Sequence, residues 1–196
     1  MPLEFLFTGD KNPLCPDTMN WSAKSTKSSE DEVNEFLYAL VRMIKPNIVV
    51  ETGCYLGDAT IPMADALNEN GFGELFTCDT DPECVLSVIS AVKNAHEHIV
   101  IVTKEEGVSL IRRMSKPIDF AFIDSSGDGK IREQEIEALI PRLARFGMFA
   151  IHDTAPHHES IHEAAKRIKM NYNLRALYFN TPRGLTLFQK QDNQIF

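Results

Sequence analysis

The chain has 196 residues, and its hydrophobic fraction of 43% is enough for the core of one globular domain. No segment approaches the roughly 18 consecutive apolar residues of a membrane-spanning helix, so we expect no membrane partner. The formal net charge of −8 would repel a phosphate backbone, which argues against nucleic acid and favours a small molecule as partner. The N-terminus lacks the basic start of a signal peptide and the cysteines form no CxxC pair, so a cytoplasmic location with reduced thiols is expected.

Residues 1–27 are expected to form an irregular N-terminal arm, because early prolines interrupt any regular element. The arm is either loose or a lid over a pocket. As a lid it would use Trp21 and Phe5 or Phe7 for apolar contacts. Residues 28–196 are expected to form a single domain.

That domain is predicted to open with a helix and then to alternate strands with helices. Ser28–Glu32 resembles a capping box, hydrophobic residues recur at helical spacing from Val33 to Ile44, and Lys45-Pro46 ends the helix. Short β-branched and apolar runs then predict strands over 47–51, 75–78, 99–102, 118–123 and 148–151. Helical periodicity predicts helices over 61–67, 81–92, 108–114, 136–143 and 161–168, with a kink at Pro141.

The last two predicted strands, 174–179 and 185–188, are joined by a loop of hairpin length and should therefore be antiparallel. The earlier strands alternate with helices, which implies right-handed crossovers and a parallel sheet covered on both faces. The predicted fold class is α/β, with a Rossmann-like, doubly wound, mostly parallel seven-stranded sheet and an antiparallel C-terminal strand pair.

Glycines and acids stand where the first two predicted strands end. Ligands of open parallel sheets bind outside the carboxyl ends of the strands. The first strand runs into Glu51 and Gly53, and Gly57 lies where the next helix begins, with GxxxG spacing rather than GxGxxG. The second strand runs into Asp79, an acid able to accept hydrogen bonds from both ribose hydroxyls. The alternative interpretation is a pair of turn glycines and a solvated aspartate.

Four segments together resemble a known family. Residues 49–57, 75–79, 118–124 and 147–154 resemble, in the same order, the motifs of class I S-adenosylmethionine-dependent methyltransferases. They are closest to small O-methyltransferases of the catechol and caffeoyl-coenzyme-A kind, and to bacterial natural-product and sugar methyltransferases with an HDT motif. The resemblance covers about residues 30–190, implies S-adenosylmethionine as cofactor and a small-molecule hydroxyl as acceptor, and allows a homodimer.

The resemblance also implies roles for individual residues. Gly53 and Gly57 would face the methionine end of the cofactor, with Glu51 fixing their loop. Asp79 would bind the ribose, and Asp124 would lie near the sulfonium and the acceptor. The adenine would lie beside the turn 103–107. The full set of implied cofactor-binding residues is Glu51, Gly53, Tyr55, Gly57, Asp79, Thr80, Gly107 and Asp124.

In metal-dependent members of such families, acids after the fourth and fifth strands hold a divalent cation such as Mg²⁺. Asp124 and Asp153 occupy these positions here and are the implied metal ligands. A bound cation lowers the pKa of a hydroxyl, and a histidine can take the proton, for which His152 and His157 are candidates. The implied catalytic residues are Asp124, His152 and Asp153. Serines follow Asp124 where many relatives carry another acid and then a base, which leaves the metal and the base open.

Two further strings suggest other functions. Asp124–Glu135 (DSSGDGKIREQE) matches a calcium-binding loop, so a calcium-binding or regulatory module on a methyltransferase-like fold is the alternative hypothesis. A strand is predicted before this loop, however, where an EF-hand has a helix. His158–His162 reads HExxH, the zinc-binding string of a hydrolase, but it falls in the first turn of a helix and toward its polar side. Solvated histidines are the simpler interpretation.

Overall fold

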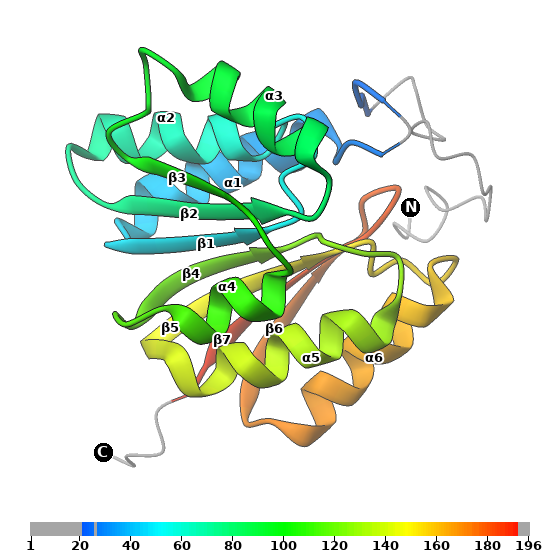
Figure 1. Cartoon of the computed structure of the whole chain (residues 1–196). Helices are drawn as coiled ribbons and strands as arrows, with labels where there is room; N and C mark the ends of the chain where they lie inside the picture. The colour runs from blue at the N-terminus through cyan, green and yellow to red at the C-terminus, as the bar shows by residue number, and fades with distance from the viewer. Residues whose placement is uncertain (1–20, 26, 192–196) are drawn as a thin grey trace.

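A computed structural model describes residues 21–25 and 27–191 of the chain (Figure 1). The predictions that concern Phe5, Phe7, Cys15 and most of the arm therefore lie outside the described residues. Within them, Cys54, Cys78 and Cys84 are buried free thiols. No helix of the described part is long and apolar enough to cross a membrane.

The described residues form one seven-stranded sheet, as predicted. Its strands are β1 (Ile48–Thr52), β2 (Glu74–Asp79), β3 (Val100–Lys104), β4 (Ile118–Ile123), β5 (Leu143–His152), β6 (Leu174–Phe179) and β7 (Leu185–Lys190). They follow the order β3-β2-β1-β4-β5-β7-β6. The first five strands are parallel, and β7 runs antiparallel to both β5 and β6. The predicted fold class is confirmed, including the antiparallel C-terminal pair.

Helices cover both faces of this sheet (Figure 1). One layer holds α1 (Asp31–Ile44), α2 (Thr60–Asn70) and α3 (Pro82–Val92), and the other holds α4 (Gly107–Arg113), α5 (Gly129–Leu139) and α6 (Glu159–Asn171). Each layer packs its apolar stripe on the sheet and forms a separate buried cluster. All five residues of β1 are buried, as expected for a central strand covered on both faces.

The strand order reverses between β1 and β4. From β1 the chain builds outward through β2 and β3, and it then returns to place β4 on the other side of β1. The helices after β1 and β4 consequently leave on opposite faces of the sheet, which opens a crevice at the carboxyl ends of these strands. Gly53 and Asp124 both lie at this crevice, and the Asp124 N–H donates to the Thr52 carbonyl across it at 2.9 Å.

Three local predictions were wrong in detail. The predicted capping box does not form, because the N-cap of α1 is Glu30, whose side chain makes no cap bond and binds His152 and Arg183 instead. The helix kink at Pro141 is absent, because α5 ends at Leu139 and a 3₁₀ turn, Ile140–Arg142, follows.

The predicted fifth strand was too short. β5 begins at Leu143, and the register against β4 shifts between Ile118 and Phe120, so residues 144–147 form an irregularity. Phe146 in this irregularity has φ 60°. Gly147 follows it, so the sequence of this segment resembles a turn and the strand was predicted to begin only after it. The strand resumes at Met148 and carries His152 to the crevice.

The described part of the arm lies against the rest of the protein without helix or strand. The Ser22 hydroxyl donates to Asp31 in the first turn of α1 at 2.9 Å, and Lys24 pairs with Asp58 at 2.8 Å. These contacts place Ser22 beside the start of α1 and Lys24 beside the loop after β1.

Candidate functional site

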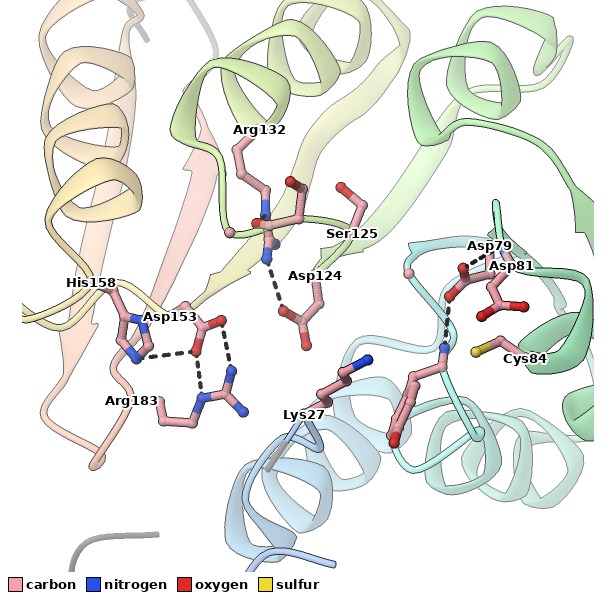
Figure 2. A pocket seen from close by; sticks show the side chains of 14 residues that line it. Lys27, Asp79, Asp81, Cys84, Asp124, Ser125, Arg132, Asp153, His158 and Arg183 are labelled. Carbon is pink, nitrogen blue, oxygen red and sulfur yellow. Dashed lines mark hydrogen bonds and ion pairs between the residues drawn. The ribbon is translucent and has the colours of Figure 1, made fainter. Parts of the chain in front are cut away.

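A pocket of about 460 Å³ lies at the crevice (Figure 2). Four of the predicted cofactor-binding residues line it: Gly53, Tyr55, Asp79 and Asp124. Its remaining wall comes from the described arm, from the start of α3, from the loop after β4, from α5 and from the loops after β5 and β6. The residues from those segments are Lys27, Asp81, Cys84, Ser125, Ser126, Gly127, Arg132, Asp153, His158 and Arg183.

The loop after β1 fixes Asp79 in the pocket wall. Gly53 turns the chain with φ 83°, and Tyr55 follows with φ 43°, an uncommon value for a residue with a side chain. This turn points the Tyr55 N–H at Asp79 Oδ2, 3.1 Å away, while the Asp81 N–H donates to Oδ1 at 2.9 Å. Asp79 is therefore an oriented hydrogen-bond acceptor that borders the pocket (Figure 2).

Glu51 lies beneath this loop and borders a small chamber beside the main pocket. Its Oε2 accepts hydrogen bonds from the hydroxyls of Thr60 and Thr77, both at 2.6 Å. Burial raises the pKa of Glu51, the two hydroxyls lower it in part, and the nearby Asp124 and Asp79 add to the rise, which brings it to about 7. The side chain joins β1, β2 and α2.

His152 forms the centre of a buried charged cluster. Its Nε2 lies 2.7 Å from Glu30 Oε2, and its Nδ1 lies 3.3 Å from Asp124 Oδ2 and 3.4 Å from Asp153 Oδ1. Burial alone would lower the pKa of His152, but Asp124, Asp153 and Glu30 raise it to about 10. The ring is fully buried and protonated at neutral pH, so it has no lone pair with which to accept a proton. This environment argues against the predicted role of His152 as a base.

Glu30 is the ionised partner of this histidine. Burial would raise the pKa of its carboxyl, but the charge and hydrogen bond of His152 and the N–H of Arg183 lower it to about 2. The cluster therefore links the start of α1 to the ends of β4 and β5.

Two arginines complete the cluster. Arg183 donates from Nε to Asp153 Oδ1 at 2.6 Å and from Nη2 to Oδ2 at 2.9 Å. Burial would raise the pKa of Asp153, but the charges of His152 and Arg183 hold it below its usual range. Arg132 is buried in α5, and its Nη2 donates to Asp124 Oδ1 at 2.9 Å. Arg132 also bonds the carbonyls of Ile123 and Ser126, so it shapes the loop after β4.

The implied metal ligands come together, yet their arrangement does not fit a divalent cation. Ligand atoms of Asp124, His152 and Asp153 lie within 4.8 Å of one another. Both carboxylate oxygens of Asp153 are engaged by Arg183, and those of Asp124 face Arg132 and His152. A hard cation needs free oxygen ligands, and a protonated imidazole offers it none.

Three predicted cofactor-binding residues are not among those that line the pocket: Gly57, Thr80 and Gly107. Gly57 faces α3, where an added Cβ would lie 3.4 Å from Val88. Gly107 is buried, and a Cβ there would lie 2.0 Å from Glu135. Gly107 therefore allows close packing behind the site, whereas the contact at Gly57 is an ordinary one and its φ of 90° is what favours glycine there. The sequence places them in the correct turns but does not show which way the turns face.

Three functional candidates in the pocket wall were missed by the sequence prediction, Lys27, Arg132 and Arg183, whereas His158 was considered there as part of the HExxH string. Lys27 reaches into the pocket from the arm and lies 5.9 Å from the centre of the Tyr55 ring (Figure 2). His158 lies beyond Asp153, with its Nε2 3.6 Å from Asp153 Oδ1. Arg183 lies in the loop between the last two predicted strands, and the local sequence does not show that this loop meets the end of β5.

Neither alternative motif forms its metal site. The would-be calcium loop follows β4 instead of a helix, and its acids serve other purposes, because Asp128 caps α5 through Lys130 N–H and Asp124 pairs with Arg132. In the HExxH string, His162 Nδ1 bonds the Thr154 carbonyl at 2.8 Å. The metal-suited group found among the described residues contains neither histidine of that string. The calcium and zinc hypotheses are therefore not favoured.

Solved structures with this fold include several methyltransferases. The O-methyltransferase TomG from Streptomyces achromogenes, in complex with SAM, is 15% identical with a TM-score of 0.73, over 85% of this chain and 83% of that one. PaMTH1 from Podospora anserina, bound to SAH, is 15% identical with a TM-score of 0.75, over 85% and 81%. An O-methyltransferase from Bacillus cereus with SAH is 16% identical with a TM-score of 0.72, over 85% and 84%.

The sequence itself matches no curated protein. A family model described as a methyltransferase domain matches residues 50–154, from the middle of β1 to just beyond β5. This match spans more than half of the chain and includes the ends of β1, β2, β4 and β5, which line the pocket. The chain belongs to the methyltransferase-domain family.

Proposed function

We propose that this protein transfers a methyl group from S-adenosylmethionine to a hydroxyl oxygen of a small molecule. The observation that carries the proposal is the placement of Asp79 and Asp124 on the walls of one pocket at the switch point of the sheet. Membership of the methyltransferase-domain family supports the reaction, and the SAM and SAH complexes of TomG and the Bacillus cereus protein support the cofactor.

The cofactor fits the charges of this pocket. Asp79, oriented by two N–H groups, would accept hydrogen bonds from the ribose hydroxyls. The turn at Gly53 brings backbone close to the methionine end, and Asp124 presents a carboxylate to the positively charged sulfonium. Catalysis then requires that the acceptor oxygen lie in line with the methyl group and the sulfur.

The acceptor must also lose a proton, and His158 is the imidazole placed to take it. It borders the pocket, its side chain is 30% exposed, and burial lowers its pKa, so it is neutral at pH 7. His157, the other sequence candidate, does not border the pocket and contacts the His158 ring, with centres 4.5 Å apart. In this proposal Asp153 orients Arg183 and the His158 ring. The protonated His152 holds the buried carboxylates together and takes no part in proton transfer.

The proposal also covers the domain organisation, the acceptor class, the location and the oligomeric state of the protein. Residues 28–196 would act as one catalytic domain, and the arm would close the pocket, which is supported by Lys27 in its wall. The net charge of −8 supports a small molecule over nucleic acid as acceptor. A cytoplasmic location and a homodimer are part of the same proposal.

Calorimetric titration with S-adenosylhomocysteine tests the cofactor site. We expect wild-type protein to bind it and Asp79→Asn to bind about 100-fold more weakly, because charged hydrogen bonds to two hydroxyls are lost. Asp119→Asn is the matched control. Asp119 also accepts two backbone N–H bonds, from Asn47 and Ile48, but at the amino end of β4, far from the pocket. Folded wild-type protein that does not bind, or equal losses in the two variants, would refute the proposed site.

A further inference from the structure

A guanidinium occupies the end of β5 where the implied metal site would be. Arg183 binds both oxygens of Asp153 in a bidentate pair, and only 12% of its side chain is exposed. Its Nη1 donates to the Ser28 carbonyl at 2.7 Å. Arg183 also borders the pocket, and these bonds use three of the five N–H donors of its guanidinium.

The backbone fixes the position of this arginine. The Arg183 N–H donates to Glu30 Oε1 at 2.8 Å, and its carbonyl accepts from the Ala155 N–H at 2.9 Å. Gly184 lies so close to the segment after β5 that an added Cβ would be 2.2 Å from the Ala155 nitrogen. The loop between β6 and β7 is thus held against the end of β5, and the guanidinium bonds two further segments of the chain, through Asp153 and the Ser28 carbonyl.

A divalent cation would have to displace this group to reach Asp153. Displacement would leave a largely buried guanidinium without its carboxylate, and the incoming ion would stand beside a second arginine, Arg132, which binds Asp124. Both costs oppose metal binding. The positive charge that a metal would bring to this place is already present.

We propose that this protein methylates its acceptor without a divalent cation, and that Arg183 supplies the fixed positive charge beside the acceptor oxygen. The inference rests on the proposed function. An N–H of Arg183 donates to the acceptor oxygen and stabilises its negative charge as the O–H bond breaks and the proton passes to His158. The oxygen then forms the bond to the methyl carbon. The carbon–sulfur bond breaks, its electron pair remains on sulfur, and neutral S-adenosylhomocysteine leaves.

Binding of Mn²⁺ alone tests the inference without knowledge of the acceptor. Metal-stripped full-length protein is titrated with Mn²⁺, with and without S-adenosylhomocysteine, and free Mn²⁺ is followed by electron paramagnetic resonance. We expect no saturable binding by the wild type. Arg183→Gln should bind one Mn²⁺ per chain at least about tenfold more tightly than wild type, because Asp153 is released.

Two further variants make the result specific. Arg183→Lys keeps a cation at the site and should not gain Mn²⁺ binding, and the double variant Arg183→Gln/Asp153→Asn should lose the gain. Saturable binding by the wild type that Asp124→Asn abolishes would overturn the inference, even if Arg183→Gln did not fold. Failure of a folded Arg183→Gln variant to bind Mn²⁺ would overturn it as well. The proposed function fails separately, through loss of S-adenosylhomocysteine binding by the wild type.

Discussion

Replacing Gly53 with alanine is expected to lower the free energy of unfolding by about 4 kcal/mol or more and to abolish binding of S-adenosylhomocysteine. The residue has φ 83°, which costs an alanine about 1 kcal/mol. A Cβ would also lie 2.4 Å from the Asp124 carbonyl oxygen and 2.6 Å from Ser125 Cα, and relief of this overlap costs about 3 kcal/mol. Only backbone stands in the way, so β1 and β4 must separate where the pocket forms.

Gly71→Ala is the matched control for this variant. Gly71 has nearly the same φ, 78°, at the end of α2, but an added Cβ there meets nothing within 4 Å. It should lose only about 1 kcal/mol and bind the cofactor product normally. Urea unfolding and calorimetry on the two variants measure both effects. Equal losses of stability would show that the close approach at Gly53 is unimportant and that only its φ matters.

The sequence predicts which residues lie at the carboxyl ends of the strands better than it predicts how those residues interact in the pocket. Asp79, Asp124 and Asp153 each follow a short apolar run, and the local pattern alone shows that these runs are strands. Parallel strands bring their carboxyl ends to one edge, so the acids were correctly expected to meet there. This step uses only neighbours along the chain and the geometry of a parallel sheet.

The chemical state of those acids depends on contacts between residues far apart in the sequence. Glu30 meets His152 across 122 positions, and the backbone of Arg183 meets Glu30 across 153. No periodicity encodes such pairs. His152 was therefore interpreted as a base from its ordinary pKa, whereas the charges of Asp124, Asp153 and Glu30 outweigh its burial and keep it protonated at neutral pH. The resemblance to metal-dependent relatives suggested a metal site because the sequence does not show that Arg183 binds both carboxylate oxygens of Asp153.

The calcium-loop string shows how one local pattern supports two structures. Asp128 and Gly129 match both a calcium loop and the start of a helix after a strand. The strand before them decides the matter, because β4 is hydrogen-bonded on both sides and leaves no entering helix. Arg132, which lies inside the string, then turns inward to bind Asp124. The elements around the string therefore determine its function.

Replacing Glu51 with glutamine is expected to change how stability depends on pH. The pKa of Glu51 is about 7 in the folded protein, against 4.5 for a free side chain. As the pH rises from 4.5 to 7, the unfolded chain loses this proton while the folded protein keeps it. Folding stability from Glu51 is thus present at low pH and is lost as the pH rises through 7. The loss amounts to about 3 kcal/mol, and glutamine, which carries no titrating proton, avoids it.

Urea unfolding of wild type and Glu51→Gln between pH 4.5 and 8 measures the difference. The hydroxyls of Thr60 and Thr77 both donate to Glu51 Oε2, and the amide oxygen of glutamine can accept the same bonds, so the variant should fold. Glu137→Gln, in an exposed part of α5, controls for the loss of one carboxyl group from the chain. We expect only Glu51→Gln to become more stable than wild type as the pH rises. Parallel curves for wild type and Glu51→Gln would mean that Glu51 is ionised in the folded protein, with its charge stabilised by the two threonines beneath the cofactor loop.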